Sequence, residues 1–198
     1  MAEVVKLVAR ELSNSEIVAG VLNRDAQAAA ALYERFSGHI NRLVWRILGG
    51  DDEHDDVVQQ VFVNALGSMG KLKDPQALGG WLVGVAINTV RREIRSRKAR
   101  RIFHLVPGTS ELPLDSLDPD QQLLAPRFYA AVSRMRASDR IVFTLRLVEG
   151  YTLGECAAAC RCSLATIKRK LARARRVFFK YARMDPVLAS WIGEVRDG

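Results

Sequence analysis

A run of basic side chains near the carboxyl end has the clearest chemical meaning in this sequence. Residues 161–183 carry Lys and Arg repeatedly and contain no Asp or Glu. Like charges spaced this closely along a helix repel one another and destabilise it unless an anion neutralises them. Phosphate groups of nucleic acid do so, and the displaced counterions favour the complex. The segment therefore predicts a nucleic-acid-binding surface.

On a helical wheel of about 100° per residue, this segment divides into two faces. The apolar face consists of Leu164, Ile167, Leu171, Ala174 and Phe178. The opposite face consists of Thr166, Arg169, Arg173, Arg176 and Lys180. A short helix, TLGECAAACR, ends just before this segment. A short helix, a tight turn and a longer basic helix predict a helix-turn-helix, whose second helix enters the major groove.

The position of each side chain on this second helix predicts the kind of DNA contact it makes. Thr166 and Arg169 lie near its start and are expected to reach base edges. Side chains that flank this face or lie further along it are expected to meet phosphate, namely Lys168, Lys170, Arg173 and Arg176. Ser163, a suitable helix cap, and Ala165 complete the predicted duplex-binding set. An ordinary solvated basic face is the alternative that the pattern leaves open.

Other residues with possible chemistry are weaker candidates. Three cysteines fall within seven residues, Cys156, Cys160 and Cys162. A tetrahedral metal site needs four ligands and no His is close in sequence, so we interpret them as small hydrophobic residues, with a metal or redox role as the alternative. His54 beside Asp55 is compatible with a metal phosphohydrolase, but only His39 and His104 remain as further His ligands. No catalytic residue, metal or cofactor is predicted.

Length and composition indicate the class of protein that carries these residues. The 198 residues suffice for two small domains, and the apolar periodicity is helical almost throughout, which predicts an all-α protein. No apolar run approaches the roughly 20 residues of a membrane span. The net charge of +8 is segregated into blocks, which indicates a polyanionic partner. The amino end lacks the uninterrupted apolar segment of a secretory signal, so the expected location is the cytoplasm.

The elements that must position these residues can be placed by range. Helices are expected over 25–48, 57–66, 81–101, 120–135, 138–148, 152–161 and 163–183. A loop is expected over 71–80, and a flexible acidic linker, rich in Pro, over 103–121. A last helix is expected to begin at Asp185 and Pro186, a cap followed by a residue without an amide hydrogen, and to include Trp191, Ile192 and Val195.

Several segments together resemble one family. LRLVEGYTLGECAAACRCSLATIKRKLARAR looks like region four of bacterial RNA polymerase sigma factors of the extracytoplasmic function (ECF) group. Upstream, LYERF, DDVVQQVFVNAL and WLVGVAIN are similar to region two of that family, in the same order and spacing. The resemblance covers about 25–101 and 123–181. It implies region two over 1–102, a linker over 103–121, region four over 122–184 and an extra helix over 185–198.

The resemblance also implies partners and roles. Such a protein binds core RNA polymerase through the beta-prime clamp helices and beta flap, recognises promoter DNA and often has an anti-sigma factor. Region four binds the minus-thirty-five duplex, and region two melts and holds the minus-ten strand. The implied polymerase contacts are Asp55, Asp56, Gln59 and Gln60. The implied minus-ten contacts are Lys71, Lys73, Trp81, Asn88, Arg91, Arg95 and Lys98. Trp81 as a core anchor and Asn88 as a buried polar residue remain open alternatives.

Some residues depart from the family pattern. Arg161 stands where the turn usually has Gly, which tolerates positive φ, and the sequence leaves the effect on the local geometry open. Gln60 and Arg92 replace acidic residues, and Gly84 and Ile87 stand where the family often has basic or polar residues. These departures bear on promoter choice and melting. A helix-turn-helix repressor or activator, which binds duplex tightly without polymerase, is the alternative function.

Overall fold

The computed structural model describes residues 12–48, 53–103 and 119–190, while the side chains of 98–103 and 119–122 lie outside the description. Within these ranges every regular element is a helix, so the predicted all-α class is confirmed. Most of the predicted linker falls outside them, as do Trp191, Ile192 and Val195 of the predicted last helix. We call residues 12–103 the N-terminal domain and residues 119–190 the C-terminal domain.

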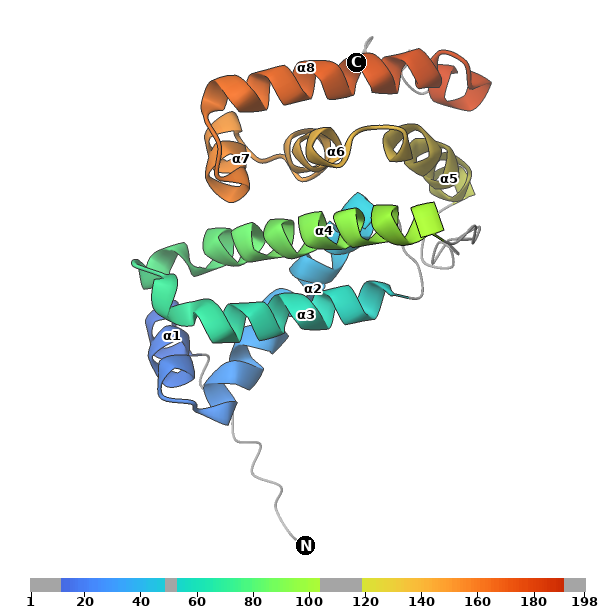
Figure 1. Ribbon diagram of the computed structural model, residues 1–198. Coiled ribbons are helices and arrows are strands. Elements are labelled where there is room, and N and C mark those ends of the chain that lie inside the picture. The colour runs from blue at the N-terminus through green and yellow to red at the C-terminus, as the bar shows by residue number, and fades with distance from the viewer. Residues whose placement is uncertain (1–11, 49–52, 104–118, 191–198) are drawn as a thin grey trace, which may run out of the picture.

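The N-terminal domain is a bundle of four helices, α1 (Asn14–Leu22), α2 (Ala26–Leu48), α3 (His54–Ser68) and α4 (Leu78–Phe103). The three longer helices pack together, and α1 lies across one end of α2 (Figure 1). Its core is largely aliphatic and includes Leu32, Ile40, Leu43, Val44, Val61, Leu82 and Val90. Each such side chain contributes about 1.5–3 kcal/mol when fully buried, so the bundle is held by many similar contributions.

Helix α1 was not expected from periodicity, but it carries a sequence signature of a helix start. The Ser13 hydroxyl accepts a hydrogen bond from the Glu16 amide at 3.2 Å, and the Ser13 amide donates to the Glu16 carboxylate at 2.8 Å. This reciprocal capping box stabilises the first turn of a nine-residue helix that buries only Ile17 and Val18. The helix is too short for a strong periodic signal.

The expected loop over 71–80 is shorter than predicted. Two single-turn 3-10 helices, η1 (Met69–Lys71) and η2 (Pro75–Ala77), lead directly into α4. The Asp74 carboxylate accepts from the Gln76 amide at 2.9 Å, and Pro75 follows it at a position where no amide hydrogen is needed. This cap begins a helical turn at Pro75, and α4 follows it without a break. Leu78 to Gly80 therefore belong to α4 and not to the predicted loop.

The C-terminal domain contains α5 (Pro119–Ser133), α6 (Ala137–Phe143), α7 (Leu153–Cys160) and α8 (Leu164–Ala182), and α8 runs along the other three (Figure 1). The predicted helix over 138–148 is regular only as far as Phe143. It continues as the π-helical turn η4 (Thr144–Val148), in which the Glu149 amide donates to the Thr144 carbonyl at 2.9 Å. Residues 186–190 are helical, and the Asp185 carboxylate caps them as predicted.

The cores of the two domains are not separate. One buried cluster joins the N-terminal bundle to residues of α6, η4, α7 and α8, namely Ile141, Val142, Leu145, Cys156, Ala159, Cys160 and Ile167. A second cluster lies wholly within the C-terminal domain, where Phe128, Phe143 and Phe178 meet at centroid distances of 5.0–6.2 Å. The two-domain organisation holds, but α4 packs directly on α7 and α6.

Candidate nucleic-acid and polymerase interfaces

Helix α7, the first helix of the predicted helix-turn-helix, begins with a capping box. The Thr152 hydroxyl accepts from the Glu155 amide at 3.2 Å, and the Thr152 amide donates to the Glu155 carboxylate at 2.7 Å. The side-chain hydrogen bond from Thr152 is the main reason that the pKa of Glu155 is lowered. This cap fixes where α7 starts and therefore where the following turn lies.

The turn has the backbone shape that a helix-turn-helix requires, although a glycine is missing. Arg161 itself adopts the left-handed conformation, with φ 49° and ψ 51°. The Arg161 and Cys162 amides donate to the carbonyls of Ala158 and Ala157, both at 3.1 Å, which closes the end of α7. The sequence left the effect of Arg161 on this turn open, and the structure shows that Arg161 takes the left-handed conformation that Gly would favour. The turn is kept, at a steric cost of about 1–2 kcal/mol for a residue with a Cβ.

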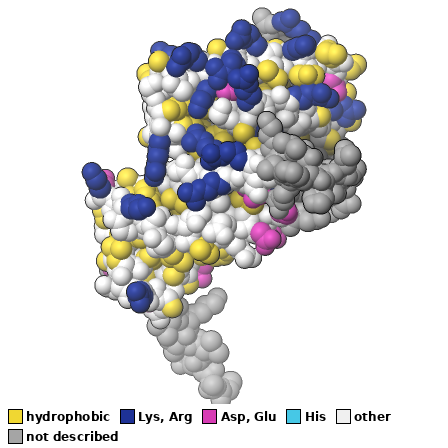
Figure 2. All heavy atoms as spheres, in the orientation of Figure 1, with side chains coloured by type: hydrophobic (Ala, Val, Ile, Leu, Met, Phe, Trp, Pro, Cys, Tyr) yellow, Lys and Arg dark blue, Asp and Glu magenta, His cyan; other side chains and the backbone are white. Residues whose placement is uncertain are grey.

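Helix α8 is amphipathic as predicted, with Ile167, Ala174 and Phe178 buried. The exception is Leu164, which was assigned to the apolar face but is 45% exposed. It occupies the first position of α8, where the helix has only begun to pack on its neighbours. Figure 2 shows dark blue side chains gathered over the part of the molecule formed by α7 and α8. Exposed basic residues of α8 are Lys168, Arg169, Arg175, Arg176 and Lys180.

The residues expected to read bases lie together at the start of α8. The Ser163 hydroxyl caps the helix by accepting from the Thr166 amide at 3.3 Å, and its oxygen lies 2.9 Å from the Thr166 hydroxyl. Arg169 donates to the same Thr166 hydroxyl at 3.3 Å. Ala165 is exposed beside them. A hydroxyl and a guanidinium next to one another on an exposed helix start can supply an acceptor and donors to base edges.

Arg173 of α8 forms an ion pair with a carboxylate on another helix. Its guanidinium donates two hydrogen bonds to the Asp139 carboxylate of α6, at 2.9 and 3.0 Å. These bonds raise the pKa of Arg173. The Asp139 side chain is only 5% exposed and that of Arg173 is 39% exposed, so the pair links α8 to the interior of the domain. Sequence reasoning missed Asp139, whose only signal was a carboxylate just before the apolar run Ile141, Val142 and Phe143.

The predicted polymerase contacts form one open face of the N-terminal domain. Asp55, Asp56, Gln59 and Gln60 are all exposed on α3. Beside them, a hollow of about 440 Å³ between α3 and α4 is lined by acidic, amide and basic side chains, among them Asp56, Gln60 and Arg92. The two acidic residues stand in the first turn of α3, where the helix dipole also favours them. The structure thus places this set together and uncovered.

The predicted minus-ten contacts do not share one open face. Lys71, Lys73 and Arg95 are exposed, and the side chain of Lys98 lies outside the description. The other three are half-buried: Trp81, Asn88 and Arg91. Trp81 packs against the large core cluster, in keeping with the anchor role that the sequence left open. Arg91 reaches across to the C-terminal domain and donates to the Cys160 carbonyl at 3.2 Å.

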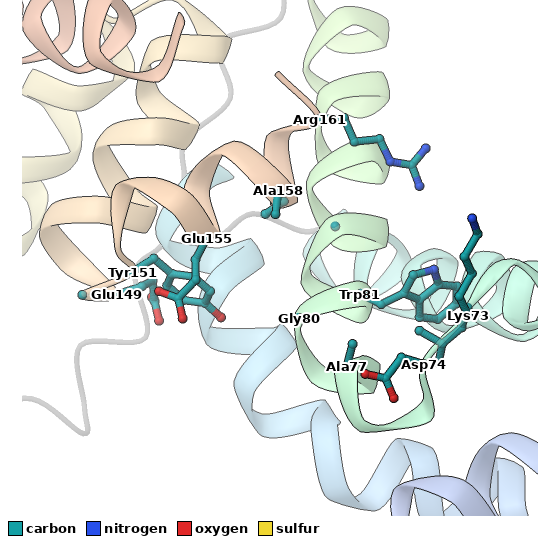
Figure 3. A pocket seen from close by; sticks show the side chains of 14 residues that line it. Lys73, Asp74, Ala77, Gly80, Trp81, Glu149, Tyr151, Glu155, Ala158 and Arg161 are labelled. Carbon is teal, nitrogen blue, oxygen red and sulfur yellow. The ribbon is translucent and has the colours of Figure 1, made fainter. Parts of the chain in front are cut away.

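A cleft of about 760 Å³ separates the two domains at this place. On one wall lie Lys73, Asp74 and Trp81, and on the other lie Glu149, Tyr151, Glu155 and Arg161 (Figure 3). Burial, with the charges of Glu149 and Glu155 adding to it, raises the pKa of Tyr151. The start of α4 therefore faces the helix-turn-helix across this cleft.

The cysteines lie where small apolar side chains are expected. Cys156 and Cys160 are buried, and Cys162 is half-buried against the same cluster. Burial raises the pKa of Cys156 to about 11 and also raises that of Cys160, which favours neutral thiols. Among the described residues no three His, Cys, Asp or Glu side chains gather in a way that would hold a metal ion.

Comparison with known proteins bears on the identity of the chain. The model of Sigma-70 region 2 matches residues 32–100, and that of Sigma-70, region 4 matches residues 126–177. The ECF RNA polymerase sigma factor EcfG of Rhodopseudomonas palustris is 30% identical over 129 residues, which are 64% of this chain and 70% of that protein. The chain belongs to the ECF sigma factor family. Region 2 lies in the N-terminal domain and region 4 in the C-terminal domain of this sigma factor.

Further relatives match almost end to end. The RNA polymerase sigma-H factor of Pseudomonas aeruginosa is 23% identical, covering 84% of this chain and 92% of that protein. The ECF RNA polymerase sigma-E factor of Escherichia coli is 23% identical, with 85% and 93% covered. The sigma factor RpoE of Bartonella quintana, solved with the anti-sigma factor NepR, has a similar fold with a TM-score of 0.62 at 20% identity, covering 77% of this chain and 95% of that one.

A second solved structure, CnrH in complex with the cytosolic domain of CnrY, gives a TM-score of 0.61 at 22% identity, covering 85% of this chain and 96% of that one. Both structures agree with the two-domain helical fold described above. Across the part of this sigma factor that the structure describes, no helix is long and apolar enough to cross a membrane.

Proposed function

We propose that this ECF sigma factor binds core RNA polymerase in the cytoplasm and directs it to promoters without catalysing a reaction itself. The observation that carries the proposal is the ordered match of both sigma regions to one chain whose two domains have the corresponding folds. Region 2 would extend over 1–102, the linker over 103–121 and region 4 over 122–184, with an additional helix over 185–198.

Region 4 is proposed to bind the minus-thirty-five duplex through α8. Thr166 and Arg169, adjacent at the exposed start of the helix, would contact base edges, and Lys168, Lys170 and Arg176 would contact phosphate. Arg173 keeps part of its guanidinium accessible, but its two bonds to Asp139 assign it first to holding α8 in place. The helix would therefore be presented to DNA by a fixed ion pair.

Region 2 is proposed to carry the other two contacts. The exposed acidic and amide face of α3 is suited to a basic surface such as the clamp helices of the polymerase beta-prime subunit. The Lys71 to Gly80 segment and α4, with Trp81 and Arg91, are suited to an unpaired strand, because cations follow the backbone and an aromatic ring stacks on a base. The beta flap would be the polymerase contact of region 4.

An anti-sigma factor is the further partner that we propose. The two solved structures of similar fold are each a complex, one with the anti-sigma factor NepR and one with the cytosolic domain of CnrY. In this chain the helix that starts at Pro186 buries Leu188 against the C-terminal domain, so its first role is in packing.

Run-off transcription with purified core polymerase on a library of candidate promoters tests the proposal. We expect initiation that depends on the sigma factor. Arg169→Ala should change which promoter is preferred, whereas Arg176→Ala should weaken all promoters about equally and reduce the salt slope of duplex binding by about 1. No initiation on any promoter, together with tight duplex binding by the protein alone, would favour the repressor or activator function instead.

A further inference from the structure

The cleft between the two domains has the size of a small-molecule site. Its volume of about 760 Å³ lies within the roughly 300–1,000 Å³ of ordinary ligand pockets. Small residues of both domains leave room inside it, namely Ala77, Gly80, Gly84, Ala158 and Ala159. No described atom lies within 4 Å of a Cβ placed on Gly80, so the space beside this residue is open. A flat molecule meets no obstruction there.

One end of this cleft is cationic and contains an aromatic ring. Lys73, from the segment before α4, lies beside the Trp81 indole, and Arg161 reaches toward the same end from the turn of the helix-turn-helix (Figure 3). Both cations are exposed, and neither forms an ion pair within the described ranges. Two positive charges from different domains therefore face the space around one aromatic side chain. We call Lys73, Trp81 and Arg161 the cationic end.

The carboxylates that line the cleft already have donors of their own. The Glu149 carboxylate pairs with Arg46 at 2.6 Å, and its side chain is only 8% exposed. The Glu155 carboxylate accepts from the Thr152 amide and hydroxyl, both at 2.7 Å. The Asp74 carboxylate accepts from a backbone amide of its own turn at 2.9 Å. The two positive charges of the cationic end are therefore left for an anion from outside the chain.

The chemistry of the cationic end fits a ligand that carries both phosphate and a flat ring. A guanidinium binds phosphate oxygens through paired N–H groups, and an ammonium adds a compact positive charge. An indole stacks on the face of any nucleobase. A small carboxylate would use only the cations, and an uncharged aromatic molecule would use only the indole. A nucleotide uses all three side chains.

We infer that the cleft binds a free nucleotide, a nucleoside diphosphate or triphosphate, with its base on Trp81 and its phosphates between Lys73 and Arg161. The binding itself goes beyond the proposed function, which gives Arg161 no contact. A consequence for transcription does rest on that function, because Lys73 and Trp81 also belong to the surface proposed for the minus-ten strand. Bound nucleotide and promoter strand would compete for these two side chains, so the nucleotide would inhibit promoter opening.

Isothermal titration calorimetry of the full-length protein tests the site directly. The probes are ADP, GDP and inorganic pyrophosphate, each without divalent cations. We expect both nucleotides to bind and pyrophosphate to bind about tenfold more weakly, because only the nucleotides bring a base to Trp81. Equal affinity for pyrophosphate would reduce the cleft to an anion-binding patch and overturn the nucleotide assignment. The absence of binding by both nucleotides would overturn the site altogether.

Two matched glycine substitutions place the ligand in the cleft. Arg161→Gly removes the guanidinium and keeps the turn, because Gly favours the left-handed φ of 49° found there. It should weaken ADP binding about tenfold, since charged hydrogen bonds to phosphate are lost. Arg24→Gly makes the same change at a left-handed arginine with φ 62° that does not line the cleft, and it should leave the ADP affinity unchanged. Equal ADP affinities of the two variants would refute the assignment to this cleft.

A substitution of the aromatic ring tests stacking separately. Trp81→Leu should weaken ADP binding about tenfold and leave pyrophosphate binding unchanged, because only the base contact is removed. The unchanged pyrophosphate affinity also verifies that the cleft remains intact. An ADP affinity equal to that of the wild type would overturn the placement of the base on Trp81.

The consequence for transcription is tested with core polymerase by promoter opening, a step that needs no nucleotide substrate. Permanganate footprinting of unpaired thymines measures it. ADP should inhibit opening by the wild type and by Arg24→Gly, and Arg161→Gly should require correspondingly more ADP. If calorimetry shows the site but no variant opens any promoter, the nucleotide site stands and the proposed function fails. If promoters open equally well at saturating ADP, the sigma function stands and the competition with the strand is refuted.

Discussion

The N-terminal and C-terminal domains use the same local devices but different cores. Each begins a helix with a capping box, Ser13 with Glu16 and Thr152 with Glu155. Each also places an arginine in the left-handed region, Arg24 at φ 62° and Arg161 at φ 49°. The large cluster that contains the N-terminal core is mostly aliphatic, whereas the smaller cluster confined to the C-terminal domain is partly aromatic and lies beside a largely buried ion pair.

This difference implies that the two domains respond differently to mutation. Many similar aliphatic contacts share the stability of the N-terminal bundle, so none of them is critical. In the C-terminal domain a few side chains each hold two or three helices together. Phe178 of α8, for instance, meets Phe128 of α5 and Phe143 of α6. Changes there should cost more per residue.

The largest expected effect is that of Phe178→Ala. Removing this ring leaves a cavity among α5, α6 and α8 and should lower the free energy of unfolding by about 3–5 kcal/mol. The matched change in the N-terminal core, Phe62→Ala, removes the same ring and should cost less, about 3 kcal/mol, because many aliphatic neighbours share that core. Urea denaturation of both variants measures the difference. Equal losses would show that the two cores respond alike.

The ion pair between α6 and α8 should respond asymmetrically. Arg173→Ala leaves the buried Asp139 carboxylate without its two guanidinium donors, at a cost of about 1–3 kcal/mol. Asp139→Ala should cost less, since the half-exposed guanidinium of Arg173 can turn to water. Arg173→Lys should not restore stability, because an ammonium cannot donate the same two parallel bonds. Thermal denaturation measures all three, and a greater loss for Asp139→Ala would contradict the assignment.

The capping boxes of α1 and α7 allow the two domains to be compared through substitutions with a smaller expected loss of stability. Thr152→Ala should lower stability by about 1 kcal/mol and loosen the helix-turn-helix, whereas Ser13→Ala should loosen α1 alone. The pKa of Glu155 is lowered in the folded protein, so its contribution is present above the ordinary value of 4.5 and lost as the pH falls below it. The stability difference between Thr152→Ala and wild type should therefore shrink in acid, as hydrogen exchange of the α7 amides can measure.

The smallest expected effect is a gain from Arg161→Gly. Relief of about 1–2 kcal/mol of left-handed strain is partly offset by about 0.4–1 kcal/mol of added freedom in the unfolded chain. A net stabilisation of about 0.5–1 kcal/mol should remain, and Arg24→Gly should behave in the same way. Arg161→Ala, which removes the charge but keeps the Cβ, is the control and should give no gain in melting temperature.

Helical periodicity was sufficient to predict most of the elements, and the reasons for its failures are physical. It placed α2, α3, α7 and α8 within a few residues, because each has a continuous apolar stripe. It missed α1, whose two buried residues make no stripe, although the Ser13-x-x-Glu16 signature was present. Leu164 was misassigned because a wheel assumes that the first turn of a helix is covered as fully as its middle.

The exposure of the basic face of α8 and of the polar face of α3 could be predicted from the sequence, but not the way the two domains face one another. The basic face of α8 and the exposed face of α3 follow from local sequence alone. The covering of α4 does not, because it depends on Gly84 and Ala159, small residues that carry no periodic or electrostatic signal. The ion pair of Arg173 with Asp139 could not be predicted for a similar reason. The two residues are 34 positions apart, and only the packing of α6 against α8 brings them together.

The α3 face has one further consequence. Asp55, Asp56, Gln59 and Gln60 stay open to solvent while α4 is occupied by α7. On the proposed assignment, core polymerase can bind this α3 face while α7 still lies on α4.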